Sequence, residues 1–255
     1  MITRDDIVQA VRSLGVQPDD LLIVHSSYKS IGGVEGGPRT VAEAIVDAVS
    51  PGGSAFVPTF NYGNDPYDPA TARSYDGVIT EFFRKLPGAI RSLHPTHPIA
   101  GIGPAAREIV EGHDKAQPFG LGSPCWRLWE RNAWVVLIGV SHEANSVAHV
   151  AEERLQMPYL DRRRTAQVVR PDGSIESVTL RRPGCSDAWA GVIEAPLRAR
   201  GAIRDGNLGS AQVKAMRAKD VVAATEQLLR DDPTALLCRN AACDACSAAR
   251  RMLEP

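Results

Sequence analysis

The chain has 255 residues, of which 44% are hydrophobic, and its formal net charge is −1. Because the charges nearly cancel, we expect no basic surface for nucleic acid. No apolar run is long enough to cross a membrane, and the N-terminal residues contain no apolar signal core. Five cysteines, an odd number in a chain of this length, indicate reduced thiols rather than a disulfide framework. We therefore expect a cytoplasmic globular protein.

The first part of the chain is predicted to alternate helices with short buried strands. A helix that begins after Thr3 ends at Leu14, and glycines at 32–37 lead into a helix that has Pro38 near its start. The remaining elements, in chain order, are strands at 21–24 and 53–58, a long loop at 61–76, a helix at 77–86, a strand near 98–102, a helix at 104–111, a strand at 133–140 and a helix at 144–155. This alternation favours a sheet covered by helices on both faces.

The pattern changes after Tyr159. Two alternating segments, 165–170 and 175–180, flank Pro171-Asp172-Gly173 and predict a β-hairpin. Helices are expected near 187–200 and 219–230. Because residues 160–255 contain too few apolar runs for a second core, we expect a single domain over 1–255, with this part packed back on the main sheet.

The predicted helix at 144–155 carries a hydroxyl, an imidazole and a carboxylate at Ser146, His149 and Glu152. On a helix, residues three apart share a face, so Glu152 can orient a His149 that acts as a general base, and Ser146 can donate a hydrogen bond. Glu153, four residues from His149, can also reach it. The structural alternatives are a buried histidine bonded to a backbone carbonyl and a serine that only caps the helix, as Asn145 can also do.

The strand that ends at His25-Ser26-Ser27 continues into a glycine-rich loop, which presents backbone N–H groups and hydroxyls without obstruction. Lys29 and Arg39 are candidates for contacts with phosphate. No Walker loop and no dinucleotide fingerprint is present, and an ordinary turn between strand and helix is the alternative.

The other candidate positions are histidines, a glycine turn and cysteines. His94 and His97 flank Pro95-Thr96 without a neighbouring acidic or cysteine ligand, and His113 and His142 read as surface or loop histidines. The turn 119–124 can aim amides at an oxyanion or simply cap a helix at Ser123. Cys238, Cys243 and Cys246 make three quarters of a zinc site, with Cys185 as a possible fourth ligand; small buried apolar residues are the favoured alternative, so no metal is expected.

Four segments in order, 24–37, 56–60, 94–100 and 145–153, resemble motifs of the aminoglycoside 3-N-acetyltransferase family, with Ser146 where the family has threonine. The resemblance implies a three-layer α/β/α fold with a central mixed sheet and a C-terminal β-hairpin plus helices, unlike the common small acetyltransferase fold. It implies acetyl transfer from acetyl-coenzyme A to the 3-amino group of an aminoglycoside, with His149, Glu152 and Ser146 as catalytic residues. The implied coenzyme A contacts are His25, Ser26, Ser27, Lys29, Ser30, Ile31, Gly32, Val34, Thr96 and His97.

An aminoglycoside is a polycation, so its site needs several carboxylates. The long loop 61–76 offers Asp65, Asp68 and Asp76, with Glu81 and Glu143 nearby in the sequence, and its tyrosines Tyr62, Tyr67 and Tyr75 can stack on sugar rings. Two other functions remain open: acetylation of a different small amine in biosynthesis, and coenzyme A binding without catalysis. We expect a monomer or a homodimer, with no nucleic acid or membrane partner.

Overall fold

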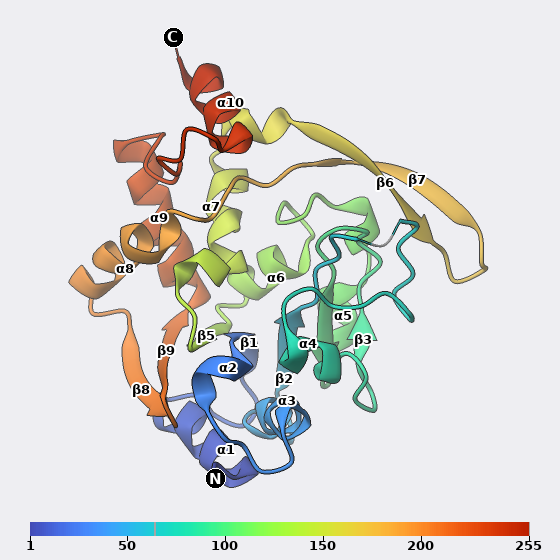
Figure 1. Cartoon of the computed structure of the whole chain (residues 1–255), viewed down its shortest axis with the longest axis vertical. Helices are drawn as coiled ribbons and strands as arrows, with labels where there is room; N and C mark the ends of the chain where they lie inside the picture. Colours follow the sequence, from blue (N-terminus) through green and yellow to red (C-terminus); the bar gives the residue numbers. More distant parts are fainter. Residues whose placement is uncertain (64, 255) are drawn as a thin grey trace.

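The computed structural model describes residues 1–63 and 65–254. Within these ranges, seven strands form one mixed sheet in the order β3-β4-β2-β1-β5-β9-β8 (Figure 1). The central strand β1 runs parallel to β2 and β5, and every other pairing in the sheet is antiparallel. The strands span Leu21–Ser26 (β1), Ser54–Pro58 (β2), Ile90–Arg91 (β3), Ile99–Ile102 (β4), Trp134–Ile138 (β5), Arg204–Leu208 (β8) and Ala211–Arg217 (β9).

The three central strands, β1, β2 and β5, are mostly apolar because both faces of the sheet are buried. Alternate side chains enter two different cores: Ile23 and Val135 face one, whereas Leu22 and Val136 face the other. The continuous apolar runs that predicted these strands therefore reflect helices on both sides, as expected.

Helices cover each face of the sheet and complete a three-layer arrangement, which confirms the predicted fold class. One core takes its helical residues from α1 (Arg4–Ser13), α3 (Pro38–Asp47) and α4 (Val78–Phe83). The other takes them from α5 (Ala106–Val110), α6 (Pro124–Glu130), α7 (His149–Arg154), α8 (Trp189–Ala199), α9 (Ala218–Asp231) and α10 (Asp244–Leu253). Among the described residues, none of the helices has both the length and the apolar character needed to span a bilayer.

The predicted hairpin is present as β6 (Arg163–Val169) and β7 (Ile175–Arg181). It forms its own two-stranded sheet and extends away from α7 and α10 toward the β3 side of the molecule (Figure 1). Backbone hydrogen bonds join Tyr67 to Gln167 and Val169, so the hairpin rests on the loop that follows β2. Residues 182–188, here called the strap, then lead from β7 to α8.

Several elements were absent from the sequence prediction. β9 lies beside β5 in the main sheet, and β8 lies beside β9. The turn that connects β8 with β9 contains Gly209, which has a positive φ of 58°. They were missed because β8 is largely exposed and β9 carries a buried lysine, Lys214, which pairs with Glu194 at 2.5 Å. The short β3, α10 and the single turn α2 (Tyr28–Ile31) were also unexpected.

Phe56 of β2 is fully buried in the sheet, whereas Phe82 of α4 is 37% exposed. We expect Phe56→Ala to lower the free energy of unfolding by about 3–5 kcal/mol, because it removes a ring and leaves a cavity. Phe82→Ala, the matched control, should cost far less. Urea unfolding of both variants measures the difference, and equal losses would contradict this description of the core.

Candidate active site

A cavity of about 580 Å³ opens beside the carboxyl ends of β1, β2 and β5. β1 contributes His25 and Ser26, β2 ends at Pro58, and the segment after β5 contributes residues 140, 143–146 and 149. Ligands of open sheets with parallel strands commonly bind at this edge, where the chain leaves neighbouring strands in opposite directions. The strap closes the cavity from the hairpin side with Arg182, Pro183, Gly184 and Ser186.

His149 and Glu152 form a hydrogen-bonded pair in this cavity. The Nδ1 atom of His149 lies 2.6 Å from Oε2 of Glu152, and the hydroxyl of Tyr159 donates to the other carboxylate oxygen, Oε1, at 2.8 Å. Burial raises the pKa of Tyr159, and the neighbouring Glu152 raises it further, so the phenol stays protonated as a donor. An ionised carboxylate can only accept, so Nδ1 carries the imidazole proton and Nε2 is left as the basic nitrogen.

Two aromatic rings fix the plane of the His149 imidazole. Phe119 stacks on it with 4.4 Å between centroids and an interplanar angle of 8°, and Trp189 contacts it at 4.3 Å with a tilt of 54°. Trp189 is itself held by a hydrogen bond from its indole to the carbonyl of Leu236, at 3.2 Å. The packing and the carboxylate together restrict His149 to one orientation.

The segment before His149 differs from the predicted continuous helix. Ser146–Ala148 is a 3-10 turn capped by Asn145, whose Oδ1 accepts from the N–H of Val147, and α7 begins only at His149. Ser146 is therefore not the cap. It is 4% exposed and lines the cavity. Glu153 points elsewhere, because its carboxylate accepts from Arg181 at 2.9 Å.

Two other histidines of the cavity, His25 and His97, are neutral because they are buried. Burial lowers the pKa of His25 to about 3 and that of His97 well below its ordinary value. His97 lines the cavity, and its Nδ1 lies 2.8 Å from the hydroxyl of Thr96. His113 and His142 lie in short connecting turns, but the interpretation of them as surface histidines is wrong, because both are buried. His113 stacks on His94, 4.4 Å between centroids, away from the cavity lining.

Of the predicted coenzyme A contacts, His25, Ser26 and His97 line the cavity. The others lie outside its lining. Ser30 bonds Ser27 at 3.0 Å and the carbonyl of Gly139 at 3.1 Å, which fixes the turn after β1. Ile31 and Val34 are buried in the core, Thr96 is buried beside His97, and Lys29 and Gly32 are exposed. Arg39, the other phosphate candidate, is paired with Glu43. Contact between the predicted residues and coenzyme A stays a prediction.

Of the predicted substrate contacts, Tyr62, Tyr75 and Asp76 line the cavity, together with Glu143. Asp65 and Asp68 do not. Asp65 accepts from the backbone of Gln167 at 2.7 Å, and Asp68 accepts from its own loop at Ala70 and Thr71. Tyr67 is fully buried with its hydroxyl on the carbonyl of Ser92, so it cannot stack on a sugar. Residue 64 of this loop lies outside the described residues.

The sequence reasoning missed the groups that reach the cavity from distant segments: Phe60, Arg164, Arg182 and, behind His149, Tyr159 and Trp189. Phe60 ends segment 56–60, which resembles a family motif, but the sequence analysis assigned it no role at the site. Nothing in the local sequence marks the other four, because their role arises only from tertiary packing. The turn 119–124 is a helix cap: Ser123 accepts from the N–H of Trp126, and only Phe119 of the turn lines the cavity.

Asp76 accepts a hydrogen bond from the backbone N–H of Phe60. Burial raises its pKa to about 6, although the hydrogen bond and Arg91 oppose the shift. Between about pH 4 and pH 6 the folded protein therefore holds this proton more tightly than the unfolded chain, so Asp76 favours folding more as the pH falls through this range.

We expect wild type to gain stability relative to Asp76→Asn as the pH is lowered from about 7 to about 4, because the neutral amide cannot titrate but still accepts from Phe60. Urea unfolding of both proteins across this range measures the difference. A difference that is constant with pH would show that the pKa of Asp76 is the same in the folded and unfolded states.

The known proteins that this chain resembles belong to one enzyme family. The sequence profile of the aminoglycoside 3-N-acetyltransferase family matches residues 23–230. Aminoglycoside N(3)-acetyltransferase IV from Salmonella sp is 32% identical over 236 residues, which cover 91% of this chain and 89% of the relative. Aminoglycoside N(3)-acetyltransferase III from Acinetobacter baumannii is 33% identical, with 87% and 89% covered.

Solved structures agree with this relationship. The apoenzyme of aminoglycoside acetyltransferase AAC(3)-IVa superposes with a TM-score of 0.89 at 32% identity and covers 98% of this chain and 97% of that one. A histidine-to-alanine mutant of the same enzyme, in complex with a gentamicin, gives a TM-score of 0.89 at 31% identity, with the same coverage. The fold, the cavity and these matches together show that the chain belongs to the aminoglycoside 3-N-acetyltransferase family.

Proposed function

We propose that the chain transfers the acetyl group of acetyl-coenzyme A to the 3-amino group of the 2-deoxystreptamine ring of an aminoglycoside. The observation that supports this most is the cavity-facing His149, whose Nδ1 is held by Glu152 and whose Nε2 is left as a base. Related solved enzymes carry a gentamicin, apramycin or sisomicin, and a more distant one, at 23% identity, carries coenzyme A.

His149 supplies the proton acceptor for the reaction. An amine nitrogen attacks only with a free lone pair, so its ammonium form must lose a proton, and Nε2 of His149 takes one in the course of the attack. Glu152 stabilises the resulting imidazolium, and Tyr159 keeps the carboxylate in place. The new C–N bond forms as the C–S bond breaks, and the imidazolium of His149 gives its proton to the leaving thiolate, which departs as coenzyme A thiol.

Ser146 is the group that we propose for contact with the thioester. It lies three residues before His149 on the cavity wall, so its hydroxyl can donate to the carbonyl oxygen as negative charge develops there. His25, Ser26 and His97 form the adjoining wall, which we assign to the pantetheine arm. The exposed guanidinium groups of Arg164 and Arg182 suit the phosphates, because both lie at the cavity and are cationic.

We propose direct attack of the amine on the thioester, without an acyl-enzyme. Cys125, the only thiol near the predicted turn, is buried and outside the cavity lining, and burial raises its pKa to about 12. Thiolates are the reactive form of cysteine, so this residue is a poor nucleophile.

We further propose that residues 1–255 act as one acetyltransferase domain in the cytoplasm, as a monomer or a homodimer. The single domain is supported by β8 and β9, which extend the main sheet from the C-terminal part of the chain. The reducing compartment is supported by the five cysteines, all of which are free.

We expect His149→Ala to lower kcat by at least about 100-fold, because general-base catalysis is worth about 10²–10⁴-fold. The KM for acetyl-coenzyme A should stay near the wild-type value. Glu152→Gln and Tyr159→Phe should lower kcat less, since they orient the imidazole and leave it in place. Steady-state release of coenzyme A thiol measures all three. A His149→Ala enzyme that keeps most of its kcat would remove this residue from the mechanism.

The carboxylates that line the cavity should determine affinity for the polycationic substrate. Asp76→Asn combined with Glu143→Gln should raise the aminoglycoside KM by on the order of ten-fold, since each partly exposed ion pair is worth about 1 kcal/mol or less. The KM should also become less sensitive to salt.

The matched control is Asp65→Asn combined with Asp68→Asn, which removes the same amount of charge from positions of the loop 61–76 that lie outside the cavity lining. Its KM should be close to wild type. If the control raises KM as much as the cavity variant, the substrate docks on the loop instead. If neither changes it, the natural substrate is a smaller amine.

A further inference from the structure

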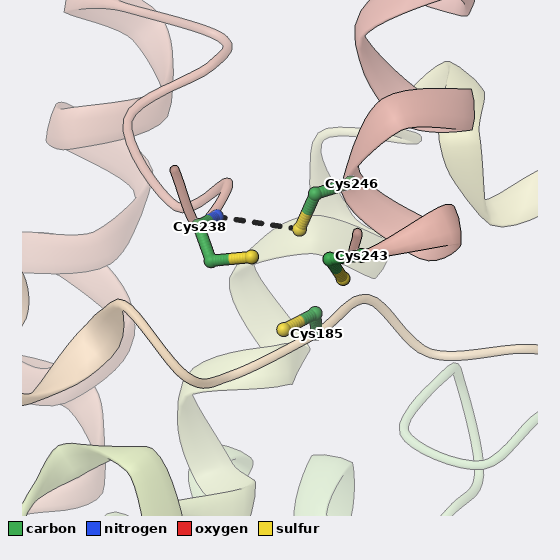
Figure 2. Close-up of side chains that lie close together, drawn as sticks. All are labelled: Cys185, Cys238, Cys243 and Cys246. Atoms are coloured by element: carbon green, nitrogen blue, oxygen red, sulfur yellow. Dashed lines mark hydrogen bonds between the residues drawn. The ribbon is translucent and has the colours of Figure 1, made fainter. Parts of the chain in front are cut away.

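Four cysteines from separate parts of the C-terminal region lie together outside the active-site cavity. Cys185 comes from the strap, Cys238 from the segment after α9, and Cys243 and Cys246 from the start of α10. Figure 2 shows their side chains gathered in one place, and their four Sγ atoms all lie within 4.8 Å of one another. All four are free thiols.

The spacing of the sulfur atoms suits a single tetrahedral metal ion. With Zn–S distances of about 2.3 Å, tetrahedral geometry puts neighbouring sulfurs about 3.8 Å apart. All four sulfurs lie within 4.8 Å of one another and none is in a disulfide, so they form one group that is close to this spacing. The ligand spacing along the chain also fits, because Cys243 and Cys246 are separated by two residues at a helix start.

Groups around the thiols would stabilise thiolate charge. The backbone N–H of Cys238 donates to Sγ of Cys246 at 3.3 Å (Figure 2). Arg250 donates to the carbonyl oxygens of Leu237, at 3.3 Å, and Cys238, at 2.7 Å, and so holds the segment that carries Cys238 against α10. Such outer hydrogen bonds orient metal ligands and tune their charge.

We propose that Cys185, Cys238, Cys243 and Cys246 bind one structural Zn²⁺ ion. Four protein ligands leave no open coordination position, so the ion takes no part in chemistry. Zinc is the divalent ion that a compact tetrahedral site of four thiolates favours.

The ion would tie α10 to the strap next to the catalytic pair. Gly184, one residue before Cys185, lies so close to Glu152 that a Cβ atom there would be 2.9 Å from Oε1 and 3.7 Å from Cε2 of Tyr159. α10 also packs on the short turn η4 (Pro158–Asp161), which carries Tyr159. Zinc would therefore hold the wall behind His149. Its effect on acetyl transfer rests on the proposed function, whereas the metal site itself does not.

Metal analysis of the purified full-length chain by plasma mass spectrometry tests the site. We expect about one zinc per chain, and substitution of Co²⁺ should give the visible absorption of a tetrahedral thiolate complex. Cys185→Ser and Cys246→Ser should lose the metal, whereas Cys125→Ser, a buried cysteine outside the cluster, should keep it. If the variants do not fold, the zinc content of the wild-type protein still tests whether the site binds the metal.

Amide hydrogen exchange tests what the ion does. Removal of zinc by a chelator should speed exchange in residues 182–188 and 158–161 and leave β1 unchanged, whereas general destabilisation would speed all three. Three results would each overturn the zinc assignment. These are four titratable thiols without metal, a disulfide within the cluster, and iron in place of zinc. Zinc binding without acetyl transfer would refute the proposed function alone.

Discussion

The hydrogen bond between Nδ1 of His149 and Glu152 is the contact on which the chemistry of the site depends. An isolated imidazole can carry its proton on either nitrogen, and only one tautomer leaves a lone pair toward the cavity. The carboxylate selects that tautomer, Tyr159 occupies its second oxygen, and Phe119 and Trp189 hold the ring in plane. Glu152 shares α7 with His149, but Tyr159, Phe119 and Trp189 come from three other segments, so this arrangement exists only in the folded chain.

The sheet explains why those segments meet. Parallel β1, β2 and β5 bring the residues after their carboxyl ends to one edge, and the antiparallel strands on either side complete the layer that the helices cover. The hairpin and the strap then close this edge from the C-terminal half of the chain. The cavity therefore combines two carboxylates, Asp76 and Glu143, with two guanidinium groups, Arg164 and Arg182, that come from later in the chain. Carboxylates suit the cationic amine of the proposed substrate, and guanidinium groups suit the phosphates of the proposed donor.

Much of the fold followed from local pattern, and much of the site did not. Apolar runs predicted β1, β2 and β5, and the Asp172-Gly173 turn predicted the hairpin, because both signals are short-range. The sequence spacing of His149 and Glu152 also predicted their contact, because residues three apart on a helix share a face. Tyr159 and Trp189 act through tertiary contacts that no spacing reveals. Tyr62, Tyr75 and Asp76 of the loop 61–76 line the cavity, but the sequence could not show which carboxylates face it, because the backbone of the hairpin binds Asp65.

The protonation state of the His149 ring tests this account most directly. ¹⁵N NMR of protein labelled at histidine, with His149→Ala used to assign the signal, reports which ring nitrogen carries the proton. We predict that Nδ1 of His149 carries the ring proton and that Nε2 is bare, and Glu152→Gln should weaken this preference. A resting imidazole protonated on Nε2, with Nδ1 bare, would contradict it, because no base would then face the cavity.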